Sequence, residues 1–326
     1  MPPCSRKSIR GGEATVNAWG LAQVVRPDLA GARPACQAGV SRVAGERYER
    51  QNPGNVRSRS VGRPACGGGV VTALPPNRFK RRLAAREQQI GLWGALPGSY
   101  VAEILAGAGF DWLVFDTEHA PGDPISVLPQ LQAAAAYEVA PVVRAATNDT
   151  VLIKRLLDAG AQTLLIPYVQ SAAEARAAVA AMRYPPRGVR GVATTTRAGR
   201  FGRVEDYVLR AETELCLIVQ VESREALDAL DEIMAVDGVD AIFIGPADLA
   251  ASLGHPGAAG HPEVVATVEE TILRIVAAGR PAGILTLDPA FARHCMALGT
   301  CFTAVGIDAA MLARGAEALA ASFKTG

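Results

Sequence analysis

The sequence predicts an α/β fold, a closed (β/α)8 TIM barrel over residues 75–326 that follows a disordered extension, residues 1–74. Eight short apolar runs alternate with helical segments from residue 77 onward. Together they occupy about 250 residues, the usual size of such a barrel. Polar side chains also follow several of the runs directly, as happens where parallel strands end at the active face of a barrel.

The eight runs are mostly continuous rather than alternating, which is typical of strands covered on both faces. A doubly wound open sheet is the alternative, but no G-x-G-x-x-G follows the first run. The expected strands are, in order, Ile90–Leu96, Trp112–Thr117, Pro141–Ala145, Thr163–Val169, Cys216–Val221, Ala241–Gly245, Ala282–Thr286 and Phe302–Gly306.

Capping residues predict where several of the intervening helices begin and end. An acid followed by proline favours a helix start, and a serine with glutamate three residues later forms a capping box. Glycine or proline favours a helix end. The predicted starts are Asp123-Pro124, Ser171 with Glu174, and Asp288-Pro289, and the predicted ends are Gly160, Pro185-Pro186 and Gly299.

Residues 1–74 are rich in Gly, Pro, Arg and Ala and show no sustained helical or strand period. We expect a disordered leader. A transit peptide is one alternative, although the segment lacks a clear amphipathic stripe. A misassigned translation start is another, with the true start near Val70, and peptides from before Val70 in the native protein would exclude it.

The formal net charge of +1 is unevenly distributed. Residues 1–74 carry eleven Lys or Arg against four acids, which leaves 22 basic against 28 acidic residues in the body. Phosphate and anionic-membrane binding need clustered cations, so we expect neither nucleic acid nor membrane as a partner. No apolar stretch approaches the roughly 20 residues of a membrane span. The six cysteines show no C-x-x-C spacing, which favours thiols in a reducing cytoplasm.

Two acidic residues follow adjacent predicted strands and are candidate metal ligands. Glu222 comes directly after Leu217–Val221, and Asp248 lies just after Ile242–Gly245. Two carboxylates at a barrel mouth, with few His or Cys nearby, suit a hard divalent cation such as Mg²⁺ or Mn²⁺. The alternative is that each carboxylate only caps the helix that follows it.

His119 and Arg144 also stand at strand ends. His119 exchanges protons near neutral pH, with Asp116 and Glu118 beside it. The guanidinium of Arg144 matches a carboxylate or a developing enolate. A structural His and a salt bridge from Arg144 to an acid at the mouth are the alternatives. Metal, arginine and His base together favour proton removal next to a carbonyl, and the lack of a strand-end lysine argues against Schiff-base chemistry.

These residues lie in motifs that resemble the HpcH/HpaI aldolase family, specifically its metal-dependent class II 2-oxo-acid aldolases, over about residues 77–323. The motifs are Gly91-Leu92-Trp93, Asp116–Pro121, Val142-Val143-Arg144, Asn148-Asp149, Gln162–Pro167, Tyr184-Pro185-Pro186, Arg190-Gly191-Val192, Val219–Glu222, Gly245–Leu249 and Val305-Gly306-x-Asp308. The resemblance implies a lyase that reversibly cleaves a 4-hydroxy-2-oxo acid, such as 4-hydroxy-2-oxoheptanedioate, into pyruvate and an aldehyde in aromatic compound catabolism.

The resemblance also implies the roles of site residues. Glu222 and Asp248 bind Mg²⁺, Mn²⁺ or Co²⁺, which chelates pyruvate and stabilises its enolate. His119, paired with Asp158, handles the proton of the C4 hydroxyl, and Asp116 and Glu118 hold water around the metal. The residues that contact substrate are Arg144, Gln220, Trp93, Ala247 and Leu285.

Asp158 is expected to lie far from His119 within one chain. If the preceding helix starts near Asn148, a rise of about 1.5 Å per residue places Asp158 about 15 Å below the mouth. Pairing would then cross a subunit boundary in a homo-oligomer, and the resemblance suggests a hexamer. The alternative is an exposed acid at the helix end.

Two other functions remain open from the sequence. One is a citramalyl-CoA or malyl-CoA type lyase of the same superfamily, although no basic cluster for CoA stands beside the mouth. The other is a non-catalytic 2-oxo-acid binding protein, against which His119 argues. Thr117 and the segment Ala145-Ala146-Thr147 depart from the family pattern, so the sequence does not define the aldehyde partner. It also does not define the metal used in the cell or the pathway.

Overall fold

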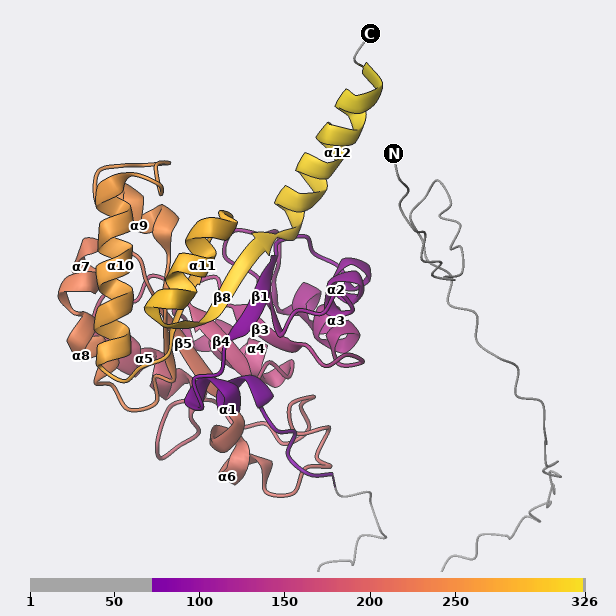
Figure 1. The fold of residues 1–326 in the computed structure, drawn as a ribbon. Coiled ribbons are helices and arrows are strands. Elements are labelled where there is room, and N and C mark those ends of the chain that lie inside the picture. Colours follow the sequence, from indigo (N-terminus) through magenta and orange to yellow (C-terminus); the bar gives the residue numbers. More distant parts are fainter. Residues whose placement is uncertain (1–71, 325–326) are drawn as a thin grey trace, which may run out of the picture. The chain divides into compact units, whose positions relative to one another are not determined.

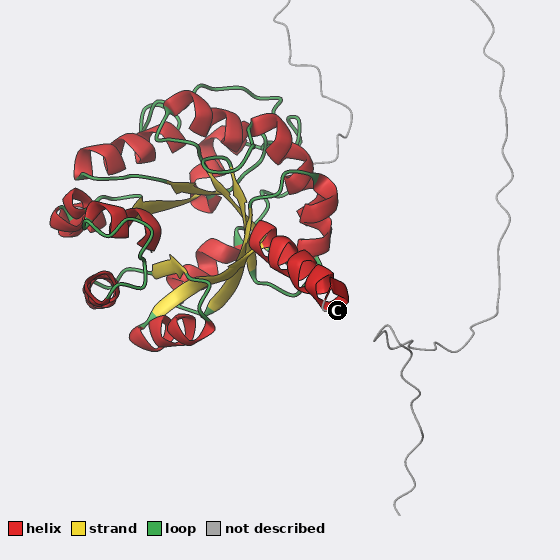
Figure 2. Cartoon of the chain, turned by 90° about the horizontal axis from the view of Figure 1, so that it is seen from above, coloured by secondary structure: helices red, strands yellow, loops and turns green. Residues whose placement is uncertain are grey.

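The computed structural model describes residues 72–324. Their strands form a closed parallel barrel in the order β1 to β8, with the helices around it (Figures 1 and 2). The predicted barrel is therefore confirmed. The strands are β1 (Gln89–Gly94), β2 (Trp112–Asp116), β3 (Ala140–Arg144), β4 (Thr163–Ile166), β5 (Cys216–Val221), β6 (Ala241–Ile244), β7 (Ala282–Leu285) and β8 (Thr300–Ile307).

The helices alternate with the strands, and α1 precedes the first strand. They are α1 (Arg78–Ala84), α2 (Ser99–Ala106), α3 (Pro124–Ala134), α4 (Thr150–Asp158), α5 (Ala172–Met182), α6 (Tyr207–Arg210), the 3-10 helix η1 (Ala211–Glu214), α7 (Arg224–Asp228), α8 (Leu230–Met234), α9 (Pro246–Ser252), α10 (Pro262–Ala277), α11 (Pro289–Leu298) and α12 (Asp308–Lys324). Three connections hold more than one helix: α5, α6 and η1 lie between β4 and β5, α7 and α8 between β5 and β6, and α9 and α10 between β6 and β7.

The helix caps follow the sequence signals, with one difference. Asp123 and Asp288 accept hydrogen bonds from the first backbone amides of α3 and α11, as predicted. Ser171 caps α5 by accepting from the amide of Glu174. The Glu174 carboxylate, however, accepts from the amide of Gln170 at 2.6 Å rather than from that of Ser171, so the reciprocal half of the predicted capping box is shifted by one residue.

Aromatic side chains fill the inside of the barrel. Trp112 lies 5.6 Å from Phe79 of α1 and 5.8 Å from Phe302, measured between ring centroids. The close approach of Trp112 to β1 requires glycine at position 91, because a Cβ there would lie 2.2 Å from the indole ring. The resulting inner core is built mainly from these aromatic side chains and smaller apolar ones.

The predicted leader lies largely outside the described residues, which begin at Thr72. Thr72 itself pairs with the loop before α6: it forms an isolated parallel bridge to Val204, and its amide donates to the carbonyl of Arg203 at 2.9 Å.

The last helix, α12, projects away from the barrel (Figure 1). Asp308 at its first position is buried and accepts hydrogen bonds from the amides of Ala95 and Leu96 just after β1. Asp308 is the only buried residue of this helix, and the side chains of Leu319 and Phe323 are exposed. The helix is thus anchored at its start and uncovered over the rest of its length.

Among the helices within residues 72–324, none combines the length and the hydropathy that a membrane crossing requires.

Candidate active site

Four strands bring the predicted polar residues to one end of the barrel. Asp116 and Arg144 are the last residues of β2 and β3 and face each other in the register of the pair. Glu222 directly follows β5, and Asp248 lies in the first turn of α9, which follows β6. The expected convergence at the C-terminal ends of the strands is what the structure shows.

Arg144 is held by two carboxylates and an indole ring. Its Nε and Nη2 donate to the two carboxylate oxygens of Asp116 at 2.8 and 2.6 Å, a two-pronged arrangement. Its Nη1 lies 2.8 Å from Glu118 Oε2, and its guanidinium carbon lies 4.8 Å from the ring centroid of Trp93. The salt-bridge alternative weighed for Arg144 therefore describes this structure. Two of its five N–H donors are engaged in the hydrogen bonds to Asp116, and the Nη1 group faces Glu118 as an ion pair.

The two carboxyl groups around Arg144 differ in acidity. Burial raises the pKa of Asp116, but hydrogen bonds and charge from Arg144 outweigh it, so the net pKa is lowered. Burial also raises the pKa of Glu118, and here the charge of Arg144 does not outweigh it. Asp116 is thus the more acidic partner, and the charge of Asp248 adds to the raised pKa of Glu118.

Glu222 is 1% exposed and is held by two hydrogen bonds. The amide of Tyr168 donates to its Oε1 at 2.8 Å, and the side-chain amide of Gln220 donates to its Oε2. Burial raises the pKa of Glu222 to about 7, the two hydrogen bonds oppose the shift, and the charges of Asp248 and Glu118 add to it. A buried carboxyl with other carboxylates nearby calls for a cation.

Tyr168 is a site residue that the sequence reasoning missed. The fourth apolar run predicted a strand through Val169, but β4 ends at Ile166, because Pro167 has no N–H to donate and Tyr168 adopts a left-handed backbone with φ 54°. That conformation points the Tyr168 amide at Glu222. The sequence carries no signal for it, since a tyrosine with positive φ is unusual.

The donor set fits a hard divalent cation. Glu222 and Asp248 offer carboxylate oxygens, and the side-chain oxygen of Gln220 is buried without a hydrogen-bond partner. Gly245 forms the floor between them, because a Cβ at this position would lie 2.2 Å from Glu222 Oε2 and 2.9 Å from Gln220 Nε2. Oxygen ligands of this kind are typical of Mg²⁺ and Mn²⁺.

Replacing Gly245 by alanine is expected to weaken divalent-cation binding at least about tenfold, because the added methyl group displaces Glu222 from its position. Titration with Mn²⁺ followed by electron paramagnetic resonance measures the affinity. Gly260→Ala is the matched control, since a Cβ at that position meets no atom within 4 Å. Unchanged affinity in Gly245→Ala would show that Glu222 is not a ligand of the cation.

His119 and Asp158 are not brought together within this chain. The His119 side chain is 64% exposed at the mouth, with its Nε2 3.9 Å from Glu118 Oε1. Asp158 is the last residue of α4, a helix that begins at the mouth after β3 and ends at the opposite side of the barrel. There its carboxylate accepts from the buried Arg190 at 2.7 Å. The predicted separation of the two residues thus agrees with the structure.

Three further residues predicted to contact substrate lie at the same end of the barrel. Trp93 is buried near the end of β1. Its Nε1 donates to Asp116 at 3.2 Å, and its ring packs against the Arg144 guanidinium, so Trp93 helps to position both residues. Ala247 is exposed beside Asp248, and Leu285 ends β7 and is partly buried against the inner core. Ala247 and Leu285 therefore offer small and apolar surface around the acidic centre.

Residues 89–315 match the protein family described as HpcH/HpaI aldolase/citrate lyase. The chain belongs to this family. It is 66% identical over 252 residues to a pyruvate aldolase of Rhizobium etli, covering 77% of this chain and 99% of that protein. A 4-hydroxy-2-oxo-heptane-1,7-dioate aldolase of Salmonella dublin is 56% identical over 248 residues, covering 76% of this chain and 94% of the relative.

A crystal structure of an HpcH/HpaI family protein from Burkholderia cenocepacia is similar in fold, with a TM-score of 0.74 and 41% identity over 76% of this chain and all of that one. The resemblance inferred from the sequence is therefore confirmed. The same holds for the predicted reaction class: the chain is a pyruvate aldolase, a carbon–carbon lyase.

Proposed function

We propose that this aldolase uses a divalent cation held by Glu222 and Asp248 to cleave a 4-hydroxy-2-oxo acid into pyruvate and an aldehyde. The observation that carries the proposal is the buried, raised-pKa Glu222 beside Asp248 and Arg144 at the barrel mouth. Mg²⁺, Mn²⁺ and Co²⁺ all suit the oxygen ligands. When bound, the cation supplies the positive charge that stabilises an enolate of pyruvate.

Arg144 and Gln220 are proposed to orient pyruvate. Arg144 is held by two hydrogen bonds to Asp116, so its other N–H donors have fixed directions. Gln220 donates through its nitrogen to Glu222, which leaves its oxygen free on the side of the cation site. Asp116 holds the guanidinium in place, and Glu118 is available to hold water beside it.

His119 is proposed to take and return the proton of the C4 hydroxyl of the substrate. Its ring is exposed at the mouth and lies near Glu118, so it meets a substrate that enters from solvent. Asp158 of a neighbouring subunit is proposed to orient that ring. The bond from Arg190 fixes one oxygen of Asp158 and leaves its side chain partly exposed for such a contact.

The proposed homo-oligomer, with a hexamer as its expected size, is supported by α12. This helix is 17 residues long and nearly uncovered, and its exposed apolar side chains include Met311, Leu312, Leu319 and Phe323. Apolar surface on that scale favours burial against a protein partner. A second copy of this chain is the partner that would also bring Asp158 of one subunit to the barrel mouth of another.

Mixing two inactive variants tests the shared site. His119→Ala and Asp158→Asn subunits, each expected to have little activity alone, are expected to recover up to about one quarter of the parent activity when co-assembled, because some mouths then combine an intact His119 with an intact Asp158. Co-assembly of His119→Ala with Glu222→Gln is the control: both residues belong to one mouth of one chain, so no recovery is expected. Equal behaviour of the two mixtures would contradict a shared site.

Release of pyruvate from 4-hydroxy-2-oxo acids tests the proposed function as a whole. The pyruvate is measured through its reduction to lactate in a coupled assay. Activity is expected to disappear with EDTA and to return with Mn²⁺. Turnover of a malyl-CoA type thioester instead would favour the lyase alternative, and metal-dependent pyruvate binding without turnover would favour a binding protein.

We also propose a cytoplasmic location. Cys216, Cys295 and Cys301 are free and buried in the described part of the chain, and burial raises the pKa of each thiol. Unreactive thiols of this kind are typical of proteins in a reducing compartment.

A further inference from the structure

A cavity of about 640 Å³ lies at the end of the barrel where the strands begin, opposite to the mouth. Its wall includes Pro141, Gln162 and Leu215, which stand at or just before the starts of β3, β4 and β5. The volume falls within the range of sites for small organic ligands. The residues of the aldolase site lie at the other ends of these strands, so the cavity is a separate space.

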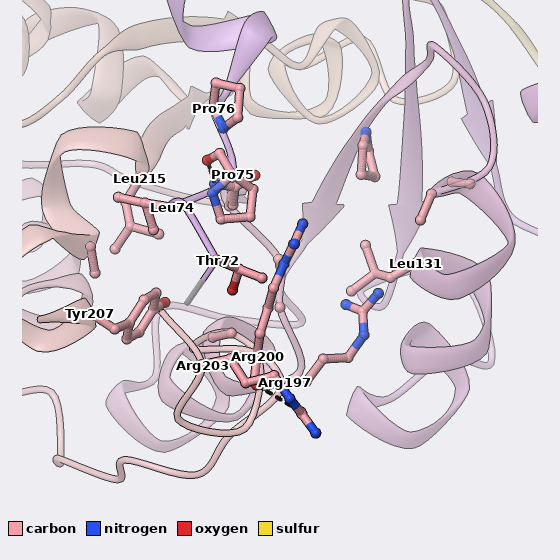
Figure 3. Close-up of a pocket in the computed structure, with 18 of the residues that line it drawn as sticks. Thr72, Leu74, Pro75, Pro76, Leu131, Arg197, Arg200, Arg203, Tyr207 and Leu215 are labelled. Carbon is pink, nitrogen blue, oxygen red and sulfur yellow. Dashed lines mark hydrogen bonds between the residues drawn. The ribbon is translucent and has the colours of Figure 1, made fainter. Parts of the chain in front are cut away.

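Three arginines of one loop line this cavity: Arg197, Arg200 and Arg203 (Figure 3). Arg197 is partly buried and donates from Nη1 to the carbonyl of Ala159 at 2.9 Å. Arg203 donates from Nη1 to the carbonyl of Arg200 at 3.1 Å. Both contacts are to backbone oxygens, so they position the guanidiniums without neutralising them.

No acidic side chain compensates these charges within residues 72–324. The cavity wall contains no Asp or Glu, and no described carboxylate lies within ion-pair distance of the three guanidiniums. Burial and the charge of Arg200 lower the pKa of Arg197, as expected for a cation that lacks a counter-charge. Such a cluster favours an anion.

The rest of the wall is mainly apolar. Leu131 comes from α3, Pro75 and Pro76 precede α1, and Tyr207 begins α6. Figure 3 shows these side chains around the same space as the arginines. A ligand that fits both features carries an acidic group at one end and a hydrocarbon body at the other.

We propose that this cavity binds a small organic anion, with Arg197 and Arg200 holding its acidic group and the wall around Leu131 holding its apolar body. Residues 1–71 carry eleven Lys or Arg against four acids, so their net positive charge does not complement these arginines. The proposal does not rest on the proposed function, because its test measures binding to the cavity and not aldol cleavage.

The test uses the full chain and the fluorescent sulfonate 8-anilinonaphthalene-1-sulfonate as probe. Saturable binding is expected, and Arg197→Gln with Arg200→Gln is expected to weaken it at least about tenfold. Ala135→Trp, which places an indole at an exposed wall position, is expected to block the apolar part and weaken binding by a similar factor. Hexanoate is expected to displace the probe at concentrations at which inorganic phosphate does not.

Arg293→Gln is the matched control, because it removes one exposed arginine from α11, which contributes no residue to the cavity wall. Its affinity for the probe should equal that of the parent. Probe binding that is absent, or that is the same in the arginine variants and the parent, would overturn the proposal. Equal displacement by inorganic phosphate and hexanoate would overturn the assignment of an apolar body.

Discussion

Replacing Glu222 by glutamine is expected to lower kcat/KM for aldol cleavage at least about a thousandfold. Glutamine keeps an oxygen that accepts from the Tyr168 amide, so the fold around the site is expected to survive. What disappears is the negative charge that would hold the cation beside Asp248. Pyruvate release measures the rate, and Mn²⁺ titration measures the lost affinity in the same preparation.

The pH dependence of Mn²⁺ binding supplies an internal check on this result. The pKa of Glu222 is raised to about 7, so its carboxyl is protonated below that pH and competes with the cation. Mn²⁺ affinity of the parent is therefore expected to fall about tenfold per pH unit below pH 7 and to level off above it. Glu222→Gln should lack this dependence around pH 7. A Glu222→Gln protein with parental Mn²⁺ affinity would remove the residue from the cation site.

The second large effect is expected for His119→Ala, which should lower the rate of cleavage by about 10² to 10⁴ while pyruvate and Mn²⁺ still bind. The exposed His119 ring makes no described hydrogen bond, so its removal leaves the surrounding structure unchanged. Pre-steady-state cleavage and equilibrium binding of pyruvate separate the two effects. His294→Ala, an exposed histidine paired with Glu269 on the barrel's side, is the control and should keep full activity. Turnover at the parental rate in His119→Ala would exclude it as the proton carrier.

The sequence predicts the barrel and the acidic centre for the same physical reason. Strand-end positions are readable from apolar runs, and parallel strands bring their ends together, so Glu222, Asp248 and Arg144 are found from spacing alone. The predicted strand Cys216–Val221 coincides with β5 residue for residue.

What the sequence does not predict are side-chain partnerships and unusual backbone conformations. Which of Asp116 and Glu118 holds Arg144 by two hydrogen bonds depends on rotamers that no periodicity records. Tyr168 was expected inside a strand, because an apolar run carries no sign that one of its residues turns left-handed. The sequence also does not show that most of α12 packs against nothing in the chain. An exposed and a buried amphipathic helix have similar spacings of apolar residues.

The charge at the mouth has a consequence for the order of association. Asp116, Glu118, Glu222 and Asp248 lie at the same end of the barrel as Arg144, whose guanidinium already shares its charge between the first two. An anionic keto acid that approaches this opening before any metal meets net repulsion. Association should therefore be ordered, with the doubly charged ion entering ahead of the keto acid and leaving after it. Excess keto acid alone would then be a weak ligand of the metal-free protein.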